Sequence, residues 1–253
     1  MLKRGPMRIQ LRERKSTGDT RVASLGFTIV EVLVAVAIIG LLLAIGLPAL
    51  GRAREAARVV DCKNHLRQIG IALQNHHSQF GQLPQDGENG YGYGAFLLAS
   101  LDQGPLEDRL KASRVPLPDP STARPELEGT ILPVFRCPSH SASEHLDPSG
   151  YARSEYIGNS ELLSTATRLT DVLDGESMTI AVGETTSDQA WALPGVAKCD
   201  VPPGSGGRFG SEHSGGAQYL MCDGAVRFIS SNVDQATIRA LGTPYGKDVV
   251  GEF

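Results

Sequence analysis

The sequence predicts an α+β protein in which a long N-terminal helix packs on a small antiparallel β-sheet. Residues 27–50 carry one charge in 24 positions, which predicts a membrane-spanning first half of that helix. Residues 59–80 repeat apolar side chains at helical spacing, and residues 218–229 have the pattern of a β-hairpin. We expect four parts: a basic leader (1–26), a transmembrane helix (27–50), its amphipathic continuation (51–82) and an outward-facing α+β domain (83–253).

The charge of the chain is divided unevenly. Residues 1–26 contain seven Lys or Arg and two Asp or Glu, a net charge of +5, whereas the other 227 residues contain 17 and 26, a net charge of −9. The hydrophobic content of 41% and charged content of 21% exclude a wholly disordered chain and a disulfide-dense mini-protein. Because phosphate recognition needs a concentrated basic surface, the acidic body predicts no nucleic-acid partner.

Residues 27–50 have the length and composition of a membrane span. A helix of 24 residues is about 36 Å long, and the hydrocarbon core of a bilayer is about 30 Å thick. The stretch is longer than the apolar region of a cleaved secretory signal and is apolar on every face, unlike a core helix. Seven basic residues precede it and three follow, so the positive-inside rule predicts a cytoplasmic N-terminus and an outward C-terminal domain.

Glu31 is the one charged residue in this span, and an ionisable group inside a membrane is costly and usually functional. No basic residue lies within one helical turn of it. A cut between Gly26 and Phe27 would create an α-ammonium four residues before Glu31, on the same helical face. The spacing therefore predicts that cleavage supplies the counter-charge, within one chain or between neighbouring chains.

The run Gly26-Phe27-Thr28-Ile29-Val30-Glu31 and the apolar residues after it resemble the class III, prepilin-type signal of type IV pilins and type II secretion pseudopilins. The resemblance implies that a prepilin peptidase cleaves after Gly26 and methylates Phe27, and that Glu31 sets the register between subunits. Pro48 lies where such helices often bend, because proline removes an i−4 hydrogen bond. The resemblance also implies a single-pass inner-membrane precursor, other pilin-like subunits as partners, and a later place in a cell-envelope or surface filament.

An apolar stripe continues the helix beyond the membrane. It consists of Val59, Cys62, Leu66, Ile69, Leu73, His76 and Phe80, spaced by three and four residues. Gly81 and Pro84 predict the end of the helix. An amphipathic helix of this kind needs a surface to pack on, so we expect it to lie against the C-terminal domain.

Residues 218–222 and 225–229 predict a hairpin around Asp223-Gly224, a pair that suits a two-residue turn with positive φ. The turn pairs Tyr219 with Phe228 and Met221 with Val226, which places all four apolar side chains on one face. Shorter elements are expected at 95–101 (helix), 131–135 (strand), 178–183 (strand) and 234–241 (helix).

Four runs outside the membrane span resemble the domain-of-unknown-function 1559 family of bacterial pseudopilin-like proteins. They are Cys62 to Leu73, Cys137-Pro138-Ser139, Asp174 to Glu184, and His213 followed after nine residues by Asp223-Gly224. Together with the prepilin-type signal, the resemblance covers essentially the whole chain. It implies a pilin-like fold and assigns no chemistry.

His213 and Asp223 suit a general-base or metal site, or a structural hydrogen bond between the Gly-rich loop and the hairpin turn. We favour the structural hydrogen bond because Asp223 already serves the turn. The Ser211-Glu212-His213-Ser214 stretch lacks a Gly-x-Ser-x-Gly elbow, so we expect no enzyme activity.

Two metal hypotheses stand beside the expectation that no cofactor is bound. The spacing of Cys137, His140, His145 and Cys199 is permissive for zinc. Calcium is the better guess on the resemblance to pseudopilins, relatives of which carry it in C-terminal loops. Its candidate ligands are Asp171, Asp174, Glu176 and Glu184, although the sequence has no Asp-x-Asp-x-Asp-Gly ladder.

The four cysteines permit disulfides if the domain faces outward. The first pairing is Cys62 with Cys137, since Cys62 lies on the packed stripe and Cys137 in a family motif. Cys222, within the hairpin, also suits a buried free thiol.

These observations predict a structural subunit that is cleaved at Gly26/Phe27 and assembles through its apolar helix into a pilus or pseudopilus. One alternative is a membrane-tethered binding or sensor module that does not polymerise. Another is a membrane-anchored hydrolase.

Overall fold

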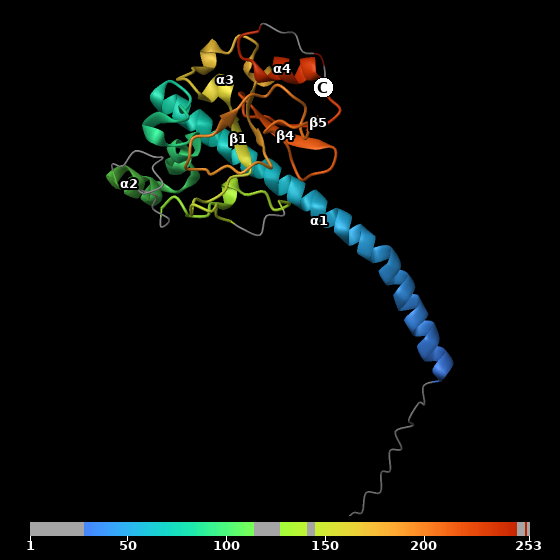
Figure 1. Cartoon of the computed structure of the whole chain (residues 1–253). Helices are drawn as coiled ribbons and strands as arrows, with labels where there is room; N and C mark the ends of the chain where they lie inside the picture. The colour runs from blue at the N-terminus through green and yellow to red at the C-terminus, as the bar shows by residue number, and fades with distance from the viewer. Residues whose placement is uncertain (1–27, 114–126, 141–144, 247–250, 252–253) are drawn as a thin grey trace, which may run out of the picture. The chain divides into compact units, whose positions relative to one another are not determined.

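The computed structural model describes residues 28–113, 127–140, 145–246 and 251 (Figure 1). The chain forms two compact units, with the boundary between residues 49 and 50. The predicted processing site, Gly26 and Phe27, lies outside the described residues.

The described part of the first unit is helical. Helix α1 (Ile29–Phe80) begins here, includes Pro48 in its interior, and continues into the second unit. Every residue from Thr28 to Ala49 is exposed, and the most apolar window of the helix has a mean hydropathy of 2.8. The helix is therefore long and apolar enough to span a membrane, consistent with single-pass anchoring.

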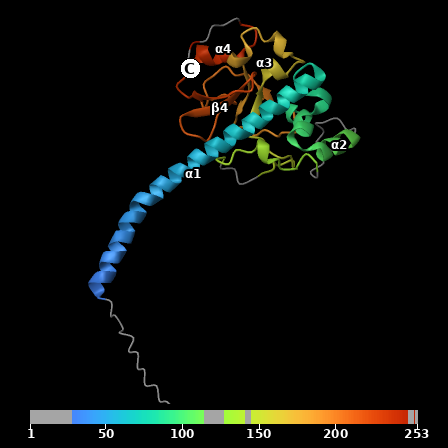
Figure 2. The same ribbon diagram turned by 180° about the vertical axis from the view of Figure 1, so that it is seen from behind.

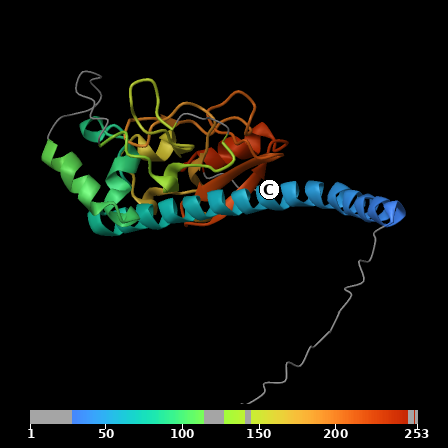
Figure 3. The ribbon, with the colours of Figure 1, turned by 90° about the horizontal axis from the view of Figure 1, so that it is seen from below.

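In the second unit, α1 packs through the predicted stripe. Its buried residues are Cys62, Leu66, Ile69, Gly70, Ala72 and Leu73, whereas Phe80 is 60% exposed and does not join the core. Gly70 permits the close approach, because a Cβ added there would lie 2.7 Å from Cδ1 of Leu220. Figures 2 and 3 show this part of α1 running along one face of the domain.

The sheet has five strands in the order β3-β1-β2-β4-β5. The strands are β1 (Tyr156–Asn159), β2 (Ile180–Glu184), β3 (Val196–Ala197), β4 (Gly216–Met221) and β5 (Val226–Ser230). All neighbouring pairs are antiparallel except β1 and β3, so the expected antiparallel sheet is wrong at this edge. The two-residue β3 returns to the sheet after a long connection from β2, which lets it run parallel to β1.

Both faces of the sheet are covered. On one face, Leu220 and Val226 belong to the same apolar cluster as the buried residues of α1. On the other, Tyr219 and Met221 pack with Ile238 of α4 (Gln235–Gly242). This two-sided burial explains why every residue of β4 is buried.

Short helices fill the connections. They are the 3₁₀ segments η1 (Glu88–Gly90), η2 (Tyr93–Leu101), η3 (Pro133–Phe135), η4 (Leu169–Asp171) and η5 (Glu176–Met178), and the α-helices α2 (Gly104–Ser113) and α3 (Ser160–Leu163). The helices predicted near 95–101 and 234–241 are confirmed. The strand predicted at 178–183 is confirmed as β2, which begins two residues later and ends one residue later. The strand predicted at 131–135 is wrong, because Pro133 has no N–H for a ladder and begins η3 instead.

The hairpin of β4 and β5 forms, but in a register one residue from the predicted one. Gln218, not Tyr219, faces Phe228, and Tyr219 faces Arg227. The loop has three residues, 222–224, with Gly224 at φ 85° and the N–H of Met221 donating to the Ala225 carbonyl at 2.8 Å. Asp223-Gly224 thus fits a turn followed by a left-handed glycine rather than the two-residue turn. In this register Phe228 lies on the same face as Val226, but it does not belong to the apolar cluster there and is 47% exposed.

Truncation of a buried residue on α1 tests this packing. Leu66 is fully buried, so Leu66→Ala should lower the free energy of unfolding by about 2–5 kcal/mol. Ile71 on the same helix is 61% exposed and serves as the matched control. Ile71→Ala should change the free energy of unfolding by less than about 0.5 kcal/mol. Denaturant unfolding of the full chain in detergent measures both, and equal losses would contradict the burial of this face.

Candidate functional site

Four buried side chains from distant parts of the sequence converge in the second unit. They are Cys62 on α1, Cys137 after η3, Glu184 at the end of β2, and His213 in the loop before β4. Each residue is at most 7% exposed, and their four donor atoms all lie within 4.8 Å of one another. We refer to these residues as the four-residue cluster.

The imidazole of His213 is the common neighbour in the cluster. Its Nε2 lies 3.3 Å from Sγ of Cys62 and 3.5 Å from Sγ of Cys137. The same nitrogen lies 3.5 Å from Oε1 of Glu184. One nitrogen, two sulfurs and one carboxylate oxygen therefore point to the same place.

Residues outside the cluster fix the orientation of the imidazole. Oε1 of Glu55 lies 2.7 Å from Nδ1 of His213. The hydroxyl of Ser139 donates to both carboxylate oxygens of Glu55, at 3.0 and 3.1 Å, and Arg58 lies 3.5 Å from Oε2. The contact to Glu55 determines that Nε2, and not Nδ1, faces the sulfurs.

The two oxygens of Glu184 have different surroundings. Oε2 accepts a hydrogen bond from the N–H of Gln218 at 2.7 Å. Oε1 is buried, makes no hydrogen bond within the described part of the chain, and faces His213. A buried carboxylate oxygen without a hydrogen bond is costly, so this atom favours a proton donor or a cation beside it.

The charges around the cluster favour a cation at its centre. The carboxylate of Glu184, followed by that of Glu55, raises the pKa of His213 to about 9, against the opposing effect of desolvation. The hydrogen bond to His213 in turn lowers the pKa of Glu55. The contact between the two thiols lowers the pKa of Cys137 and raises that of Cys62. The site therefore suits a positive charge, either a protonated imidazole or a metal ion.

A small hollow adjoins the cluster. Its walls include Cys137, Glu155, Glu184 and Ser211, and its volume is about 10 Å³. This is room for roughly one water molecule. An organic substrate does not fit there.

The predicted hydrogen bond between His213 and Asp223 is wrong. The carboxylate of Asp223 accepts instead from the N–H of Ala225 at 2.8 Å, within the hairpin loop. His213 turns to Glu55 and the two cysteines, contacts that the sequence separates by at least 76 residues. Gly224 has the positive φ that the turn requires.

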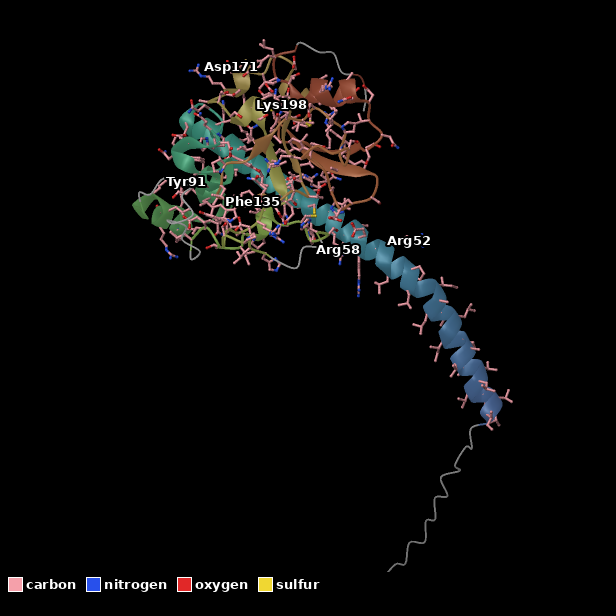
Figure 4. All side chains as sticks on the ribbon, in the orientation of Figure 1. Arg52, Arg58, Tyr91, Phe135, Asp171 and Lys198 are labelled. Atoms are coloured by element: carbon pink, nitrogen blue, oxygen red, sulfur yellow. The ribbon has the colours of Figure 1, made fainter. Side chains whose placement is uncertain are left out.

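Neither predicted metal set assembles. Among the described residues, the four-residue cluster is the one group of three or more His, Cys, Asp or Glu with converging donor atoms, and it takes Glu184 from the calcium set and Cys137 from the zinc set. Figure 4 places Asp171 far from Arg58, which is the ion-pair partner of Glu55 beside the cluster. His140 lies 3.9 Å from Glu212 instead.

The cysteines are paired in space as predicted, but not covalently. Cys62 and Cys137 both contact His213, yet both are free thiols, so the predicted disulfide is absent from the structure. Cys222 is a buried free thiol, as the alternative held, and so is Cys199.

In the first unit, Glu31 has partners that the sequence analysis overlooked. Oε2 of Glu31 accepts from the N–H and the hydroxyl of Thr28, at 2.9 and 2.8 Å, and the N–H of Glu31 donates to that hydroxyl at 3.3 Å. This is a capping box, for which Thr-x-x-Glu is the sequence signature. The carboxylate is thus stabilised at the start of α1 before any cation is supplied.

Comparisons with known proteins give one match. No curated protein and no solved structure matches the chain. A family model described as "Protein of unknown function (DUF1559)" matches residues 51–201 and 198–236, a range that contains all of the four-residue cluster. Since the match covers well over half of the sequence, the chain belongs to the DUF1559 family of proteins of unknown function.

Proposed function

We propose that the protein is a membrane-anchored, pseudopilin-like structural subunit that assembles through the first half of α1 into a pilus or pseudopilus. The observation that supports this most is the division of α1 between two environments. Fourteen large apolar side chains from Ile29 to Leu50 are exposed, whereas the helix is buried in the domain from Cys62 to Leu73.

An apolar surface of this size is not stable in water and needs lipid or other helices to cover it. In the membrane, lipid covers the first half of α1. In a filament, the same surface packs against the helices of neighbouring subunits. The second half of α1 keeps the domain attached in both states, since its buried face is already occupied.

The proposal gives the chain an orientation and partners. The basic leader keeps the N-terminus in the cytoplasm and the domain enters the periplasm. A prepilin peptidase removes residues 1–26 and methylates Phe27. The partners after cleavage are other pilin-like subunits, and the role is structural rather than enzymatic.

Glu31 has two separable roles under this proposal. The capping box stabilises the start of α1 within one chain. The carboxylate also pairs with the α-ammonium of Phe27, in the same or a neighbouring subunit, and so sets the register.

The mature N-terminus tests the processing step. We expect mass spectrometry of the protein from cells that contain a prepilin peptidase to find a chain beginning at methylated Phe27. Gly26→Val should retain the leader, because the residue before the cut is lost. Gly18→Val, a second glycine in the leader, is the matched control and should be processed normally. A wild-type chain that keeps residues 1–26 would overturn the proposal.

Three variants separate the two roles of Glu31. Thr28→Ala removes the cap and keeps the charge, Glu31→Gln keeps a capping side chain and removes the charge, and Glu31→Ala removes both. Filament assembly is measured by chemical cross-linking of neighbouring subunits. If charge pairing sets the register, both Glu31 variants should fail to assemble, whereas Thr28→Ala should still form filaments. Assembly by Glu31→Gln at the wild-type level would reduce Glu31 to a cap. Absence of filaments in the processed wild type would favour a tethered module.

A further inference from the structure

We propose that Cys62, Cys137, Glu184 and His213 bind one zinc ion in a closed structural site that joins α1 to the sheet. The inference concerns the domain alone and does not depend on filament assembly. It replaces both metal sets that the sequence suggested.

The donor set selects the metal. Two thiolates and an imidazole are ligands for soft or borderline ions, and zinc combines them with a carboxylate. Calcium prefers six to eight oxygens, and iron–sulfur clusters usually need four cysteines. The four-residue cluster offers one carboxylate, one imidazole and two sulfurs.

The distances fit tetrahedral coordination. Zinc bonds are about 2.3 Å long to sulfur and about 2.1 Å long to nitrogen or oxygen. With tetrahedral angles, a sulfur and a nitrogen ligand lie about 3.6 Å apart, and a nitrogen and an oxygen ligand about 3.4 Å apart. Nε2 of His213 lies 3.3 and 3.5 Å from the two sulfurs and 3.5 Å from Oε1 of Glu184. These three separations are close to those of ligands around one ion, and the remaining donor pairs lie within 4.8 Å.

The surroundings of the ligands are those of a metal site. A ligating histidine usually donates its other N–H to a carboxylate, and Glu55 holds Nδ1 of His213 at 2.7 Å. Glu184 offers the buried oxygen that lacks a hydrogen bond, while its second oxygen is fixed by Gln218. The ion would give this oxygen a direct bond in place of its 3.5 Å contact to His213.

Two other uses of these residues fit less well. A Cys137–His213–Glu55 arrangement resembles a nucleophile with its base and orienting acid, but the adjoining hollow of about 10 Å³ admits no substrate larger than water. A Cys62–Cys137 disulfide would use both sulfurs and leave Oε1 of Glu184 with its 3.5 Å contact to His213 alone. Four protein ligands from four segments instead form a closed site, which is typical of structural zinc.

The metal content of the full chain tests the proposal. We expect about one equivalent of zinc by elemental analysis of the protein purified in detergent, and less than about a tenth of an equivalent in Cys62→Ser and Cys137→Ser. Cys199→Ser and Cys222→Ser are matched controls, because these thiols are equally buried and free but lie outside the cluster. Wild-type protein without stoichiometric zinc, or equal loss in all four variants, would overturn the proposal.

Cobalt and Glu55 provide a test that does not require removal of a ligand. Co²⁺ added to the metal-depleted chain should give the thiolate charge-transfer and visible bands of a tetrahedral site. Glu55→Gln should weaken zinc binding about 10–100-fold in competition with a chelator, because the carboxylate positions His213. Glu161→Gln, at a half-buried glutamate paired with Lys198, is the control and should bind as wild type. Octahedral Co²⁺ spectra, or unchanged affinity in Glu55→Gln, would count against the site.

Thiol chemistry distinguishes zinc from the disulfide. Alkylation of Cys62 and Cys137 should be slow and should accelerate when a zinc chelator is added, whereas Cys199 and Cys222 should respond to the chelator little or not at all. A Cys62–Cys137 bridge in peptides from the protein as isolated from cells would overturn the proposal.

Discussion

The second unit depends on the burial of one face of α1 against the sheet. Leu66, Ile69 and Leu73 are at most 3% exposed, and burial of each such side chain contributes about 1.5–3 kcal/mol. Gly70 brings the helix to Leu220, a residue of β4. Because β4 has strands on both sides, this contact anchors the helix to an inner strand of the sheet rather than to an edge.

The four-residue cluster lies where this apolar contact begins. Cys62 is the first buried residue of α1 and precedes Leu66 by about one turn. Glu55 precedes Cys62 by two turns on the same side of the helix, so α1 supplies both a sulfur and the carboxylate that orients His213. Zinc would add directional bonds at the end of an interface that is otherwise held by non-directional burial.

Local patterns in the sequence predicted the elements well. The period of the stripe gave the buried face of α1, and Asp223-Gly224 located the hairpin. The register of the hairpin was missed because Asp-Gly suits both a two-residue turn and a three-residue loop with a left-handed glycine, and the loop here is the longer one. Both faces of β4 are buried, so an apolar side chain is accommodated on either face. The alternation of apolar residues therefore could not decide the register of the hairpin.

The cluster was missed for a different reason. Its residues are separated by 75, 47 and 29 positions, and spacing rules for metals describe ligands that are close in the chain. A signal was nevertheless present, since each of the four family-like runs supplies one member: Cys62, Cys137, Glu184 and His213. None of these four residues has a role in a local turn or helix cap that the sequence would explain. That shared property was a reason to consider them together as one site. Asp223, in contrast, has its reason within the turn.

Glu31 shows how a capping role and a pairing role can coexist in one carboxylate. Among the described residues, the hydrogen bonds from Thr28 both end on Oε2. Under the proposed processing, removal of residues 1–26 would leave Thr28 as the second residue of the mature chain, so the cap would survive cleavage. Oε1, which the hydrogen bonds from Thr28 do not use, would remain for the new α-ammonium. The cap holds the carboxylate in a fixed place at the start of α1, and a fixed place is what a charge needs if it is to set the register of a neighbouring subunit.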